Sequence, residues 1–321
     1  MKWLFVGPNL LSGIGQVTRG YASLVNGEYV VYSEGTTPSQ DKYDICFAFV
    51  LPLRKNLEYI DSISHLCDRI VYMTVCETQT VHQSYSSLVQ CKPMYVPSQF
   101  AKERLEAQFP EMECKVLHHW ARRPRVHKFL APFVQVTPES PYIFYTIGNI
   151  LDARKNLRGI VQAFKACNFP NARLLLKATC AKPVTITVPN VAVINGLVSE
   201  DHLDKIHDGC HCYINASHSE GVGMGAVEAA VRNKPIIIAD YGGLKEYVKT
   251  PYVIPCKLDK IGFDDFLFKK DMEWGHPSIA HLVAAMKDCY NKRLGRMNHA
   301  HTKNLITEVQ NTLENIAQTE L

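Results

Sequence analysis

The sequence predicts an α/β protein of two doubly wound, Rossmann-like domains, in which parallel strands alternate with helices. Its 321 residues are many for one domain and natural for two. Short, continuous apolar runs suit strands that are buried on both faces of a parallel sheet, and segments with helical periodicity separate them. A strand, a glycine-containing loop and a helix follow one another at residues 2–25 and again at residues 142–164, which is how such domains begin.

The composition is that of a globular protein, with 46% hydrophobic and 21% charged residues. A net charge of +4 does not indicate a nucleic acid partner. The eleven cysteines are too few and too irregular for a disulfide scaffold, so we expect reduced thiols and a cytoplasmic location. No apolar stretch approaches the roughly 20 residues that cross a bilayer. We therefore expect a protein without a transmembrane segment, and peripheral contact with a membrane stays open.

We assign residues 1–135 to the first domain and expect its first strand at residues 2–6. The loop after this strand contains Gly13 and Gly15 and lacks the full G-x-G-x-x-G order of a dinucleotide site. Further strands are expected at residues 44–51, 69–74, 94–96 and 114–118. Ser98 is the predicted N-cap of a helix that ends near Gln108. A basic run at residues 122–128 fits either a solvated linker or a surface for anionic lipid or a phosphorylated acceptor.

The second domain is assigned to residues 136–300, with strands expected at residues 142–147, 173–178, 191–195 and 235–239. Ser199 begins an acidic N-cap after a bend at Gly196. Helical periodicity is seen at residues 274–290 and 297–317. We expect the segment 301–321 to form a C-terminal helix.

The chain is organised around residues 213–248, where an apolar strand ends at Ala216 and is followed by a glycine-rich turn and a helix. Free N–H groups and the helix dipole make such a turn an anion site. Glu220 lies just before the turn, and Glu228 lies within the helix, about a turn further along. Two carboxylates beside an anion site suit a diphosphate that carries hydroxyls on both sides, as a nucleotide sugar does. Solvated surface acids in an ordinary βαβ unit are the alternative interpretation.

Residues 220–246 contain E-G-x-G-x-x-x-x-E-A and then P-[IV]-I-x-A-D-x-G-G-x-x-E. This order resembles the donor-site signature of family 4 glycosyltransferases, which are retaining enzymes of the two-domain GT-B fold. Gly225 departs from the family, which commonly has proline there. The resemblance implies two domains that face each other across a cleft, with the C-terminal helix crossing back to the first domain.

The resemblance also assigns roles to residues. Glu220 and Lys155 would be catalytic, and the residues implied in donor binding are Gly13, Gly15, Asn149, Lys155, Leu197, Val198, Gly221, Val222, Gly223, Met224 and Glu228. Lys155 would grip the diphosphate, Glu220 the transferred sugar and Glu228 the ribose. Asn149 stands where arginine is common, and the adjacent Arg154 is expected to point away from Lys155. A plain tight turn is the alternative for the first-loop glycines.

Glu77 follows the strand at residues 69–74, in a Glu-Thr segment that several family members share near the acceptor. It would contact the acceptor, or it would cap a helix that carries Val81 and Tyr85. Both interpretations stay open.

The implied reaction transfers a sugar from a nucleoside diphosphate to a hydroxyl group with retention. We expect UDP-glucose as donor, on family frequency, and a glycan, a lipid-linked or a protein-linked hydroxyl as acceptor. No cofactor is expected, and no metal, because Lys155 and backbone amides would neutralise the diphosphate and no D-x-D motif occurs. The alternatives are a catalytically silent sugar-nucleotide-binding protein, an epimerase of similar fold and, less favoured, an NAD-dependent enzyme.

Overall fold

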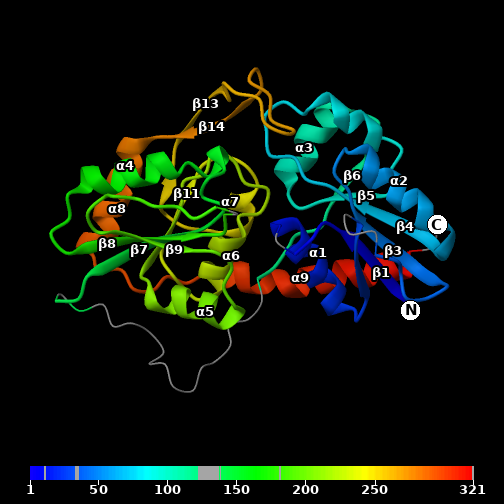
Figure 1. The fold of residues 1–321 in the computed structure, drawn as a ribbon, viewed down its shortest axis with the longest axis horizontal. Coiled ribbons are helices and arrows are strands. Elements are labelled where there is room, and N and C mark those ends of the chain that lie inside the picture. The colour runs from blue at the N-terminus through cyan, green and yellow to red at the C-terminus, as the bar shows by residue number, and fades with distance from the viewer. Residues whose placement is uncertain (11, 33–35, 122–136, 138, 181, 320–321) are drawn as a thin grey trace. The chain divides into compact units, whose positions relative to one another are not determined.

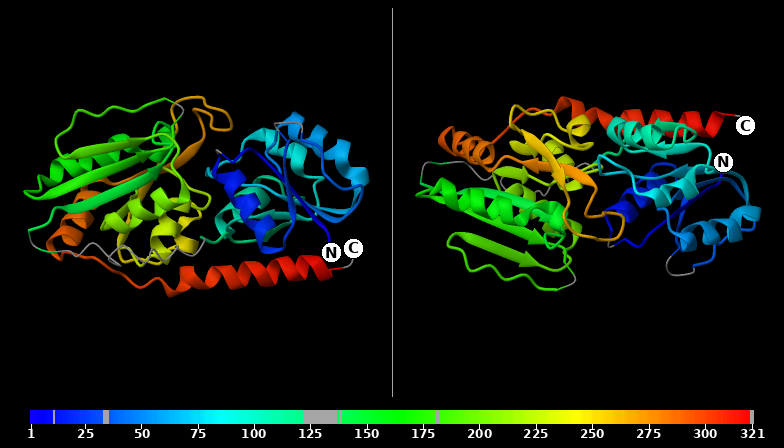
Figure 2. Two further views of the ribbon diagram at one scale, coloured as in Figure 1. Left: turned by 60° about the horizontal axis from the view of Figure 1, so that its bottom comes forward. Right: turned by 90° about the horizontal axis from the view of Figure 1, so that it is seen from above.

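The structure is a computed structural model that describes residues 1–10, 12–32, 36–121, 137, 139–180 and 182–319. The chain divides into two compact units, which Figures 1 and 2 show as separate sheets with helices packed against them. Unit 1 consists of Met1–His119, Ile261–Met272 and Leu305–Leu321, and unit 2 of Trp120–Lys260 and Glu273–Asn304. The predicted boundary at residue 135 and the basic run at residues 122–128 lie outside the described residues.

Unit 1 contains a six-stranded parallel sheet with the order β2-β1-β3-β4-β5-β6. Its strands are β1 (Trp3–Gly7), β2 (Glu28–Val31), β3 (Tyr43–Phe49), β4 (Cys67–Met73), β5 (Met94–Val96) and β6 (Cys114–Val116). Its helices are α1 (Gly13–Leu24), α2 (Arg54–Ile63) and α3 (Gln99–Gln108), with 3-10 turns η2 (Ser64–Leu66) and η3 (Gln83–Leu88). The strands expected in this domain are present.

The sequence pattern explains these elements. Every residue of β1 is buried, which is why the strand reads as an unbroken apolar run. Trp3 and Phe5 stack on one face with ring centroids 5.6 Å apart, and Leu4 and Val6 belong to the core cluster on the other face. The Ser98 hydroxyl accepts a hydrogen bond from the Ala101 N–H at 3.1 Å and caps α3, as predicted.

Unit 2 contains a second six-stranded parallel sheet with the order β12-β11-β10-β7-β8-β9. Its strands are β7 (Tyr142–Gly148), β8 (Ala172–Ala178), β9 (Val191–Asn195), β10 (Cys212–Asn215), β11 (Ile236–Ala239) and β12 (Val253–Ile254). Its helices are α4 (Leu157–Cys167), α5 (Glu200–Gly209), α6 (Met224–Val231), α7 (Leu244–Tyr247) and α8 (Ile279–Asn291), with the 3-10 turn η4 (Ala153–Lys155). The two parallel sheets confirm the predicted α/β fold class.

The helix expected over residues 274–290 is only partly correct. Residues Glu273–Pro277 form the strand β14, which pairs antiparallel with β13 (Cys256–Lys260), and α8 begins only at Ile279. Pro277 lacks an N–H and ends the strand, and the Ser278 hydroxyl caps α8. The apolar periodicity was misleading here because Trp274 is buried in a strand that pairs with β13. The sequence around Trp274 does not reveal this pairing.

The last helix, α9 (Ala300–Gln318), has its first residues in unit 2 and continues in unit 1 from Leu305. Its buried stripe consists of Leu305, Val309, Leu313 and Ile316. The guanidinium of Arg69 donates hydrogen bonds to the carbonyls of Ile316 and Thr319. A cation interacts favourably with the negative, carboxyl end of a helix dipole. This contact therefore holds the end of α9 against β4, the strand that carries Arg69.

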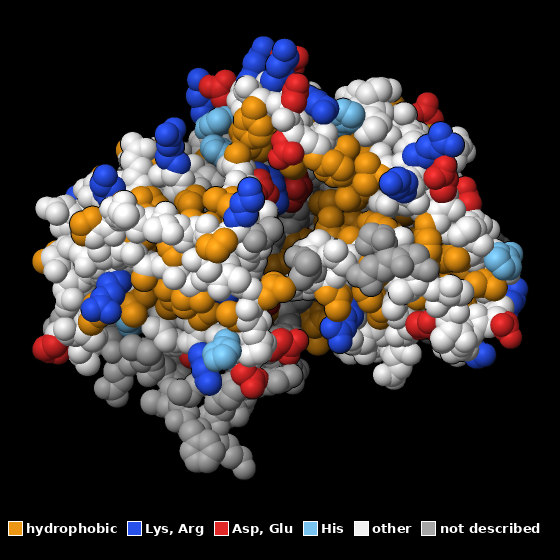
Figure 3. Space-filling model, viewed as in Figure 1, with side chains coloured by type: hydrophobic (Ala, Val, Ile, Leu, Met, Phe, Trp, Pro, Cys, Tyr) orange, Lys and Arg blue, Asp and Glu red, His pale blue; other side chains and the backbone are white. Residues whose placement is uncertain are grey.

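Charged side chains of both signs are interspersed on the face drawn in Figure 3, in keeping with the small net charge. All eleven cysteines are free, as the sequence predicts. No helix in the described part of the chain combines the length and the apolar character that crossing a bilayer requires.

Candidate active site

The loops that carry Lys155 and Glu220 follow two neighbouring strands, β7 and β10. The chain runs from β7 outward through β8 to β9 and then returns to β10 on the other side of β7. The topology therefore reverses between β7 and β10, and open α/β sheets bind ligands at the carboxyl ends of the strands at such a point. This connectivity brings two residues that are 65 positions apart to one site.

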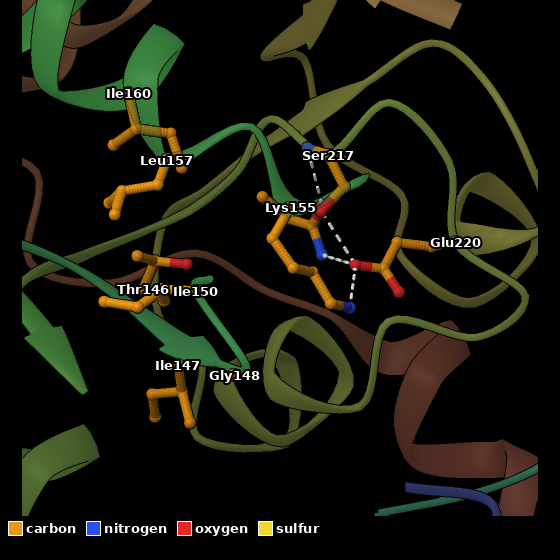
Figure 4. Close-up of a pocket in the computed structure, with 10 residues that line it drawn as sticks. Thr146, Ile147, Gly148, Ile150, Lys155, Leu157, Ile160, Ser217 and Glu220 are labelled. Carbon is orange, nitrogen blue, oxygen red and sulfur yellow. Dashed lines mark hydrogen bonds and ion pairs between the residues drawn. The ribbon is translucent and has the colours of Figure 1, made fainter. Parts of the chain in front are cut away.

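Glu220 is the centre of a buried cluster of charges. Its side chain accepts from Lys155 Nζ at 2.6 Å and from Ser217 Oγ at 2.8 Å (Figure 4). It also accepts from Arg154 Nη1 at 3.3 Å. Burial by itself would raise the pKa of Glu220, but the charges of Lys155 and Arg154 and the hydrogen bonds from Lys155 and Ser217 outweigh burial and lower this pKa to about 2. Glu220 is therefore a carboxylate at neutral pH.

The 3-10 turn η4 places both cations on Glu220. Asp152 closes the turn by accepting from the Arg154 N–H at 2.9 Å, and it also pairs with the Arg154 guanidinium at 3.2 Å. Asn156, in the left-handed conformation, caps α4 and donates to the Ala216 carbonyl at 2.9 Å. The expectation that Arg154 points away from Lys155 was wrong, because it assumed the side-chain directions of a regular helix and not those of this turn.

The glycine-rich turn after Glu220 leads into α6 as predicted. Gly223 has a φ of +75°, and a Cβ there would lie 2.8 Å from the Leu244 side chain, so only glycine fits. No side chain caps the helix at Gly223, and the Ala226 N–H donates to the Gly223 carbonyl at 2.9 Å. The predicted donor residues Gly221, Val222, Gly223 and Met224 therefore lie at the N-terminus of α6 beside Glu220, where the positive end of the helix dipole favours an anion.

The glycine at position 225, where the resembling family commonly has proline, is explained by Tyr213 on β10. A Cβ at position 225 would lie 2.2 Å from the Tyr213 hydroxyl. That hydroxyl also donates to the Ile147 carbonyl at 3.2 Å, at the end of β7. Tyr213 thus joins the two site strands to the start of α6, and this arrangement requires a small residue at position 225.

Glu228 lies on α6 and is held by His207, a residue that the sequence analysis did not single out. His207 Nε2 lies 3.2 Å from Glu228 Oε2, and Nδ1 lies 2.9 Å from the Tyr145 hydroxyl. Burial lowers the pKa of His207 and opposes the effect of Glu228. Because a carboxylate only accepts, the neutral ring donates through Nε2 and accepts from Tyr145 through Nδ1. The buried residues of α5 are Asp204, Ile206 and His207.

The predicted nucleobase bend at Leu197 and Val198 lies between β9 and α5. Gly196 has a φ of +83°, and Leu197 is 66% exposed. Lys177, which is buried on β8, donates to the Gly196 carbonyl at 2.5 Å and to the Ala178 carbonyl at 3.2 Å. Burial lowers the pKa of Lys177. A buried ammonium thus fixes the bend, and the exposed Leu197 offers an apolar surface.

Asn149 is exposed, and its backbone carbonyl accepts from the Asp152 N–H at 3.0 Å. It is not among the residues that line the small cavity under Lys155, which Figure 4 shows. This cavity has a volume of about 10 Å³, room for about one water. Thr146, Gly148 and Asn215 contribute to its wall. It lies behind the charged cluster and is too small for a nucleotide.

His218 braces the loop between β10 and Glu220. Its ring stacks on Trp274 of β14 with centroids 4.8 Å apart and an interplanar angle of 6°, and its Nδ1 lies 2.8 Å from the Gly275 carbonyl. Burial lowers the pKa of His218 to about 4, so the ring is neutral at pH 7. The β13–β14 hairpin therefore supports the loop that carries Glu220.

Gly13 and Gly15 lie in unit 1, at the start of α1. The Ser12 hydroxyl accepts from the Gly15 N–H at 3.0 Å and caps the helix. A Cβ at Gly15 would lie 2.2 Å from the Asn9 carbonyl oxygen, whereas nothing lies within 4 Å of a Cβ at Gly13. Gly15 is thus required by the loop itself, and Gly13 is the open position of the two.

Glu77 follows β4 and lines a second cavity, in unit 1. The alternative in which it caps the next helix was wrong. That helix is the 3-10 turn η3, and its cap is His82, whose side chain accepts from the Ser84 N–H.

Comparison with known proteins agrees with this architecture. Residues 188–256 match the family model described as Glycosyl transferases group 1. This range includes Leu197, Val198, Glu220 and Glu228, and Lys155 lies outside it. A search of curated protein sequences found no match.

Solved structures of similar fold cover almost the whole chain. A glycosyltransferase from Rickettsia africae is 11% identical with a TM-score of 0.63 and covers 99% of each chain. The structure described as trehalose-6-phosphate from E. coli bound with UDP-2-fluoro glucose is 8% identical with a TM-score of 0.67 and covers 100% of each chain. WaaG, a glycosyltransferase involved in lipopolysaccharide biosynthesis, is 11% identical with a TM-score of 0.59, and the match covers 99% of this chain and 100% of the WaaG chain. The predicted GT-B fold class is confirmed.

We expect Gly225→Ala to lower the free energy of unfolding by about 1–3 kcal/mol, because the new Cβ overpacks against the Tyr213 hydroxyl. Tyr213→Phe removes that hydroxyl, so the double variant should lose less than the sum of the two single losses. Urea titrations of the four proteins measure this coupling. Strictly additive losses would contradict the contact.

We expect Glu220 to make stability depend on pH in acid. Its folded pKa of about 2 lies below the ordinary glutamate pKa of 4.5, so its contribution to stability is complete above pH 4.5 and is lost as the pH falls towards 2. The shift corresponds to roughly 3 kcal/mol. In Glu220→Gln this part of the acid dependence should be absent. Urea unfolding at pH 6, 4 and 3 checks this, and parallel curves for the two proteins would exclude it.

Proposed function

We propose that this protein is a retaining glycosyltransferase of family 4, which moves a sugar from a nucleoside diphosphate, with UDP-glucose as the favoured donor, to a hydroxyl acceptor. The observation that carries the proposal is the cluster of Lys155, Arg154 and Glu220 next to the open N-terminus of α6. Cations and amides suit a diphosphate, and a carboxylate beside them suits the hydroxyls of the attached sugar.

In the proposed complex, three groups of the protein bind different parts of the ligand. The amides of residues 221–224 and Lys155 bind the diphosphate, Glu220 binds hydroxyls of the transferred sugar, and Glu228 binds the ribose. His207 holds the Glu228 carboxylate at 3.2 Å, which fixes its orientation before the donor arrives. Leu197 and Val198 lie against the nucleobase. The seven residues between Glu220 and Glu228 therefore separate the group that binds the transferred sugar from the group that binds the ribose.

Donor binding must reorganise the charged cluster. In the unliganded arrangement Lys155 and Arg154 are neutralised by Glu220 and Asp152. A diphosphate carries more charge than one carboxylate, so it draws Lys155 towards itself and leaves Glu220 to accept from sugar hydroxyls. The bond from the anomeric carbon to the diphosphate then breaks. A bond to the acceptor oxygen forms on the same face, and the acceptor proton passes to the diphosphate. Lys155 and Arg154 then stabilise the departing charge without a metal.

Uridine diphosphate and UDP-glucose should raise the melting temperature in excess EDTA, because a ligand of the folded state stabilises it. Guanosine diphosphate at the same concentration should raise it less. Donor hydrolysis followed by proton NMR in the same buffer separates sugar release from inversion at C2, which an epimerase would give. A rise in melting temperature with guanosine nucleotides alone would contradict the uridine donor. A strict requirement of donor hydrolysis for a divalent metal would contradict the metal-free mechanism.

Glu220→Gln and Glu228→Gln should affect different kinetic constants. Glu220 contacts the sugar that becomes cationic, so its loss should lower kcat by about 30- to 150-fold, equivalent to 2–3 kcal/mol. Glu228 contacts the ribose equally in ground and transition states, so its loss should appear mainly in KM.

UDP affinity provides the control. Glu220→Gln removes the competitor for Lys155, so this variant should bind UDP at least as tightly as the parent, whereas Glu228→Gln should bind it more weakly. Glu314→Gln, on the exposed side of α9, is the matched neutral variant. A Glu220→Gln enzyme with normal kcat would end the proposed role of this residue.

A further inference from the structure

A cavity of about 150 Å³ lies in unit 1, apart from the residues of the charged cluster. Its wall includes Ile14 after β1, Leu51 after β3 and Val75 after β4. In the strand order, β2 and β3 lie on opposite sides of β1, so the topology reverses between β1 and β3. The cavity therefore lies at the switch point of this sheet, where open α/β sheets bind ligands.

The wall of the cavity is mostly apolar. Its apolar members are Ile14, Leu51, Val75, Cys76, Tyr85, Phe266, Leu267 and Phe268. Two of the polar groups are already used within the chain, since the Tyr85 hydroxyl donates to the Val75 carbonyl at 2.5 Å and the Thr78 hydroxyl donates to the Thr80 carbonyl at 2.7 Å. His82 is likewise used within the chain, because its side chain accepts from the Ser84 N–H and caps η3. Glu77 is the other polar side chain of the wall. Such a site favours an apolar group with few polar atoms.

One wall comes from the segment Ile261–Met272, which connects β13 to β14 and clusters with unit 1. Leu267 packs against the hydrophobic core of unit 1. The backbones of Asp265 and Phe268 exchange hydrogen bonds of 2.8 and 2.6 Å, which closes a tight turn. The wall is therefore a defined turn that is anchored by one leucine.

Phe266 occupies the tip of this turn in an unfavourable state. Its φ is +33°, a region that bulky residues rarely adopt, and its side chain is 54% exposed. Neither backbone preference nor burial accounts for phenylalanine at this position. Local strain of this kind is typical of functional sites, and here it presents an aromatic ring at the edge of the cavity.

We propose that this cavity binds an aromatic ring of the acceptor, so that the substrate is a phenol or an aryl alcohol; this rests on the proposed glycosyl transfer. An apolar cavity of about 150 Å³ is large enough for one benzene ring. Tyr85, Phe266 and Phe268 supply rings that stack on such a group or meet it edge to face. A bare sugar would bury hydroxyls without partners, and a long alkyl chain exceeds the volume.

The probe is 4-fluorophenol, whose binding to the full chain is measured by fluorine NMR without any donor. We expect a Kd on the order of 1 mM, as for a ligand of this size. Phe266→Ala should weaken binding about three- to tenfold. Val75→Phe fills the cavity and should weaken binding more than tenfold. Phe263→Ala, in the same segment but outside the cavity wall, is the matched control and should bind as the parent does.

Phe266→Gly separates recognition from folding. Glycine adopts a φ of +33° without strain, so this variant should melt at or above the temperature of the parent and still bind the probe more weakly. A purely structural role for Phe266 would leave binding unchanged in both Phe266 variants, and that result would overturn the proposal. Equal binding by Val75→Phe, tighter binding of 1-octanol, or no binding by the parent protein would also overturn it.

The binding test does not depend on glycosyl transfer. If the protein binds 4-fluorophenol in this cavity but neither binds nor hydrolyses a nucleotide sugar, the proposed function fails and the aromatic site remains. If donor hydrolysis is found and 4-fluorophenol does not bind, the acceptor class is wrong and the donor chemistry stands. Aryl glycoside formed from UDP-glucose and 4-fluorophenol, and lost in Val75→Phe, would support both proposals together.

Discussion

The buried carboxylate of Glu220 is the constraint on which the rest of unit 2 depends. A carboxylate that is 5% exposed is costly to bury unless cations and hydrogen bonds neutralise it. Lys155 and Arg154 come from the loop after β7, and Ser217 from the loop after β10. The two loops must therefore meet in one geometry, and the site is preorganised by the same contacts that stabilise the fold.

The second acid is fixed in a different way. Glu228 faces a neutral histidine, and that histidine is held by Tyr145 from β7. Tyr213, next to this pair, links the end of β7 to the first turn of α6. Strand β7 thus positions both acids, one through a cation and one through a hydrogen-bonded ring. The proposed donor would therefore replace a contact of Glu220 while the contacts of Glu228 with His207 stay in place.

The sequence predicted both sheets, most strand positions and the cap of α3, because continuous apolar runs and Ser98 are local signals. It placed Lys155, Glu220 and Glu228 in one site by resemblance. It did not predict that Lys155 and Arg154 both pair with Glu220, since that depends on a 3-10 turn. His207 was missed because a histidine on a helix has no distinctive spacing, and β14 because its partner strand lies at residues 256–260.

The hairpin that was missed contributes to both of the proposed sites. Trp274 on β14 stacks on His218, two residues before Glu220, while the segment that joins β14 to β13 forms a wall of the aromatic cavity through Phe266. One continuous segment of the chain therefore supports the loop that carries Glu220 and forms a wall of the cavity. Trp274 is 2% exposed. A shift of the turn at Phe266 on ligand binding would therefore displace the chain next to a buried side chain. Strand β14 contacts the loop that carries Glu220 through the stacking of Trp274 on His218 and the hydrogen bond between His218 and the Gly275 carbonyl.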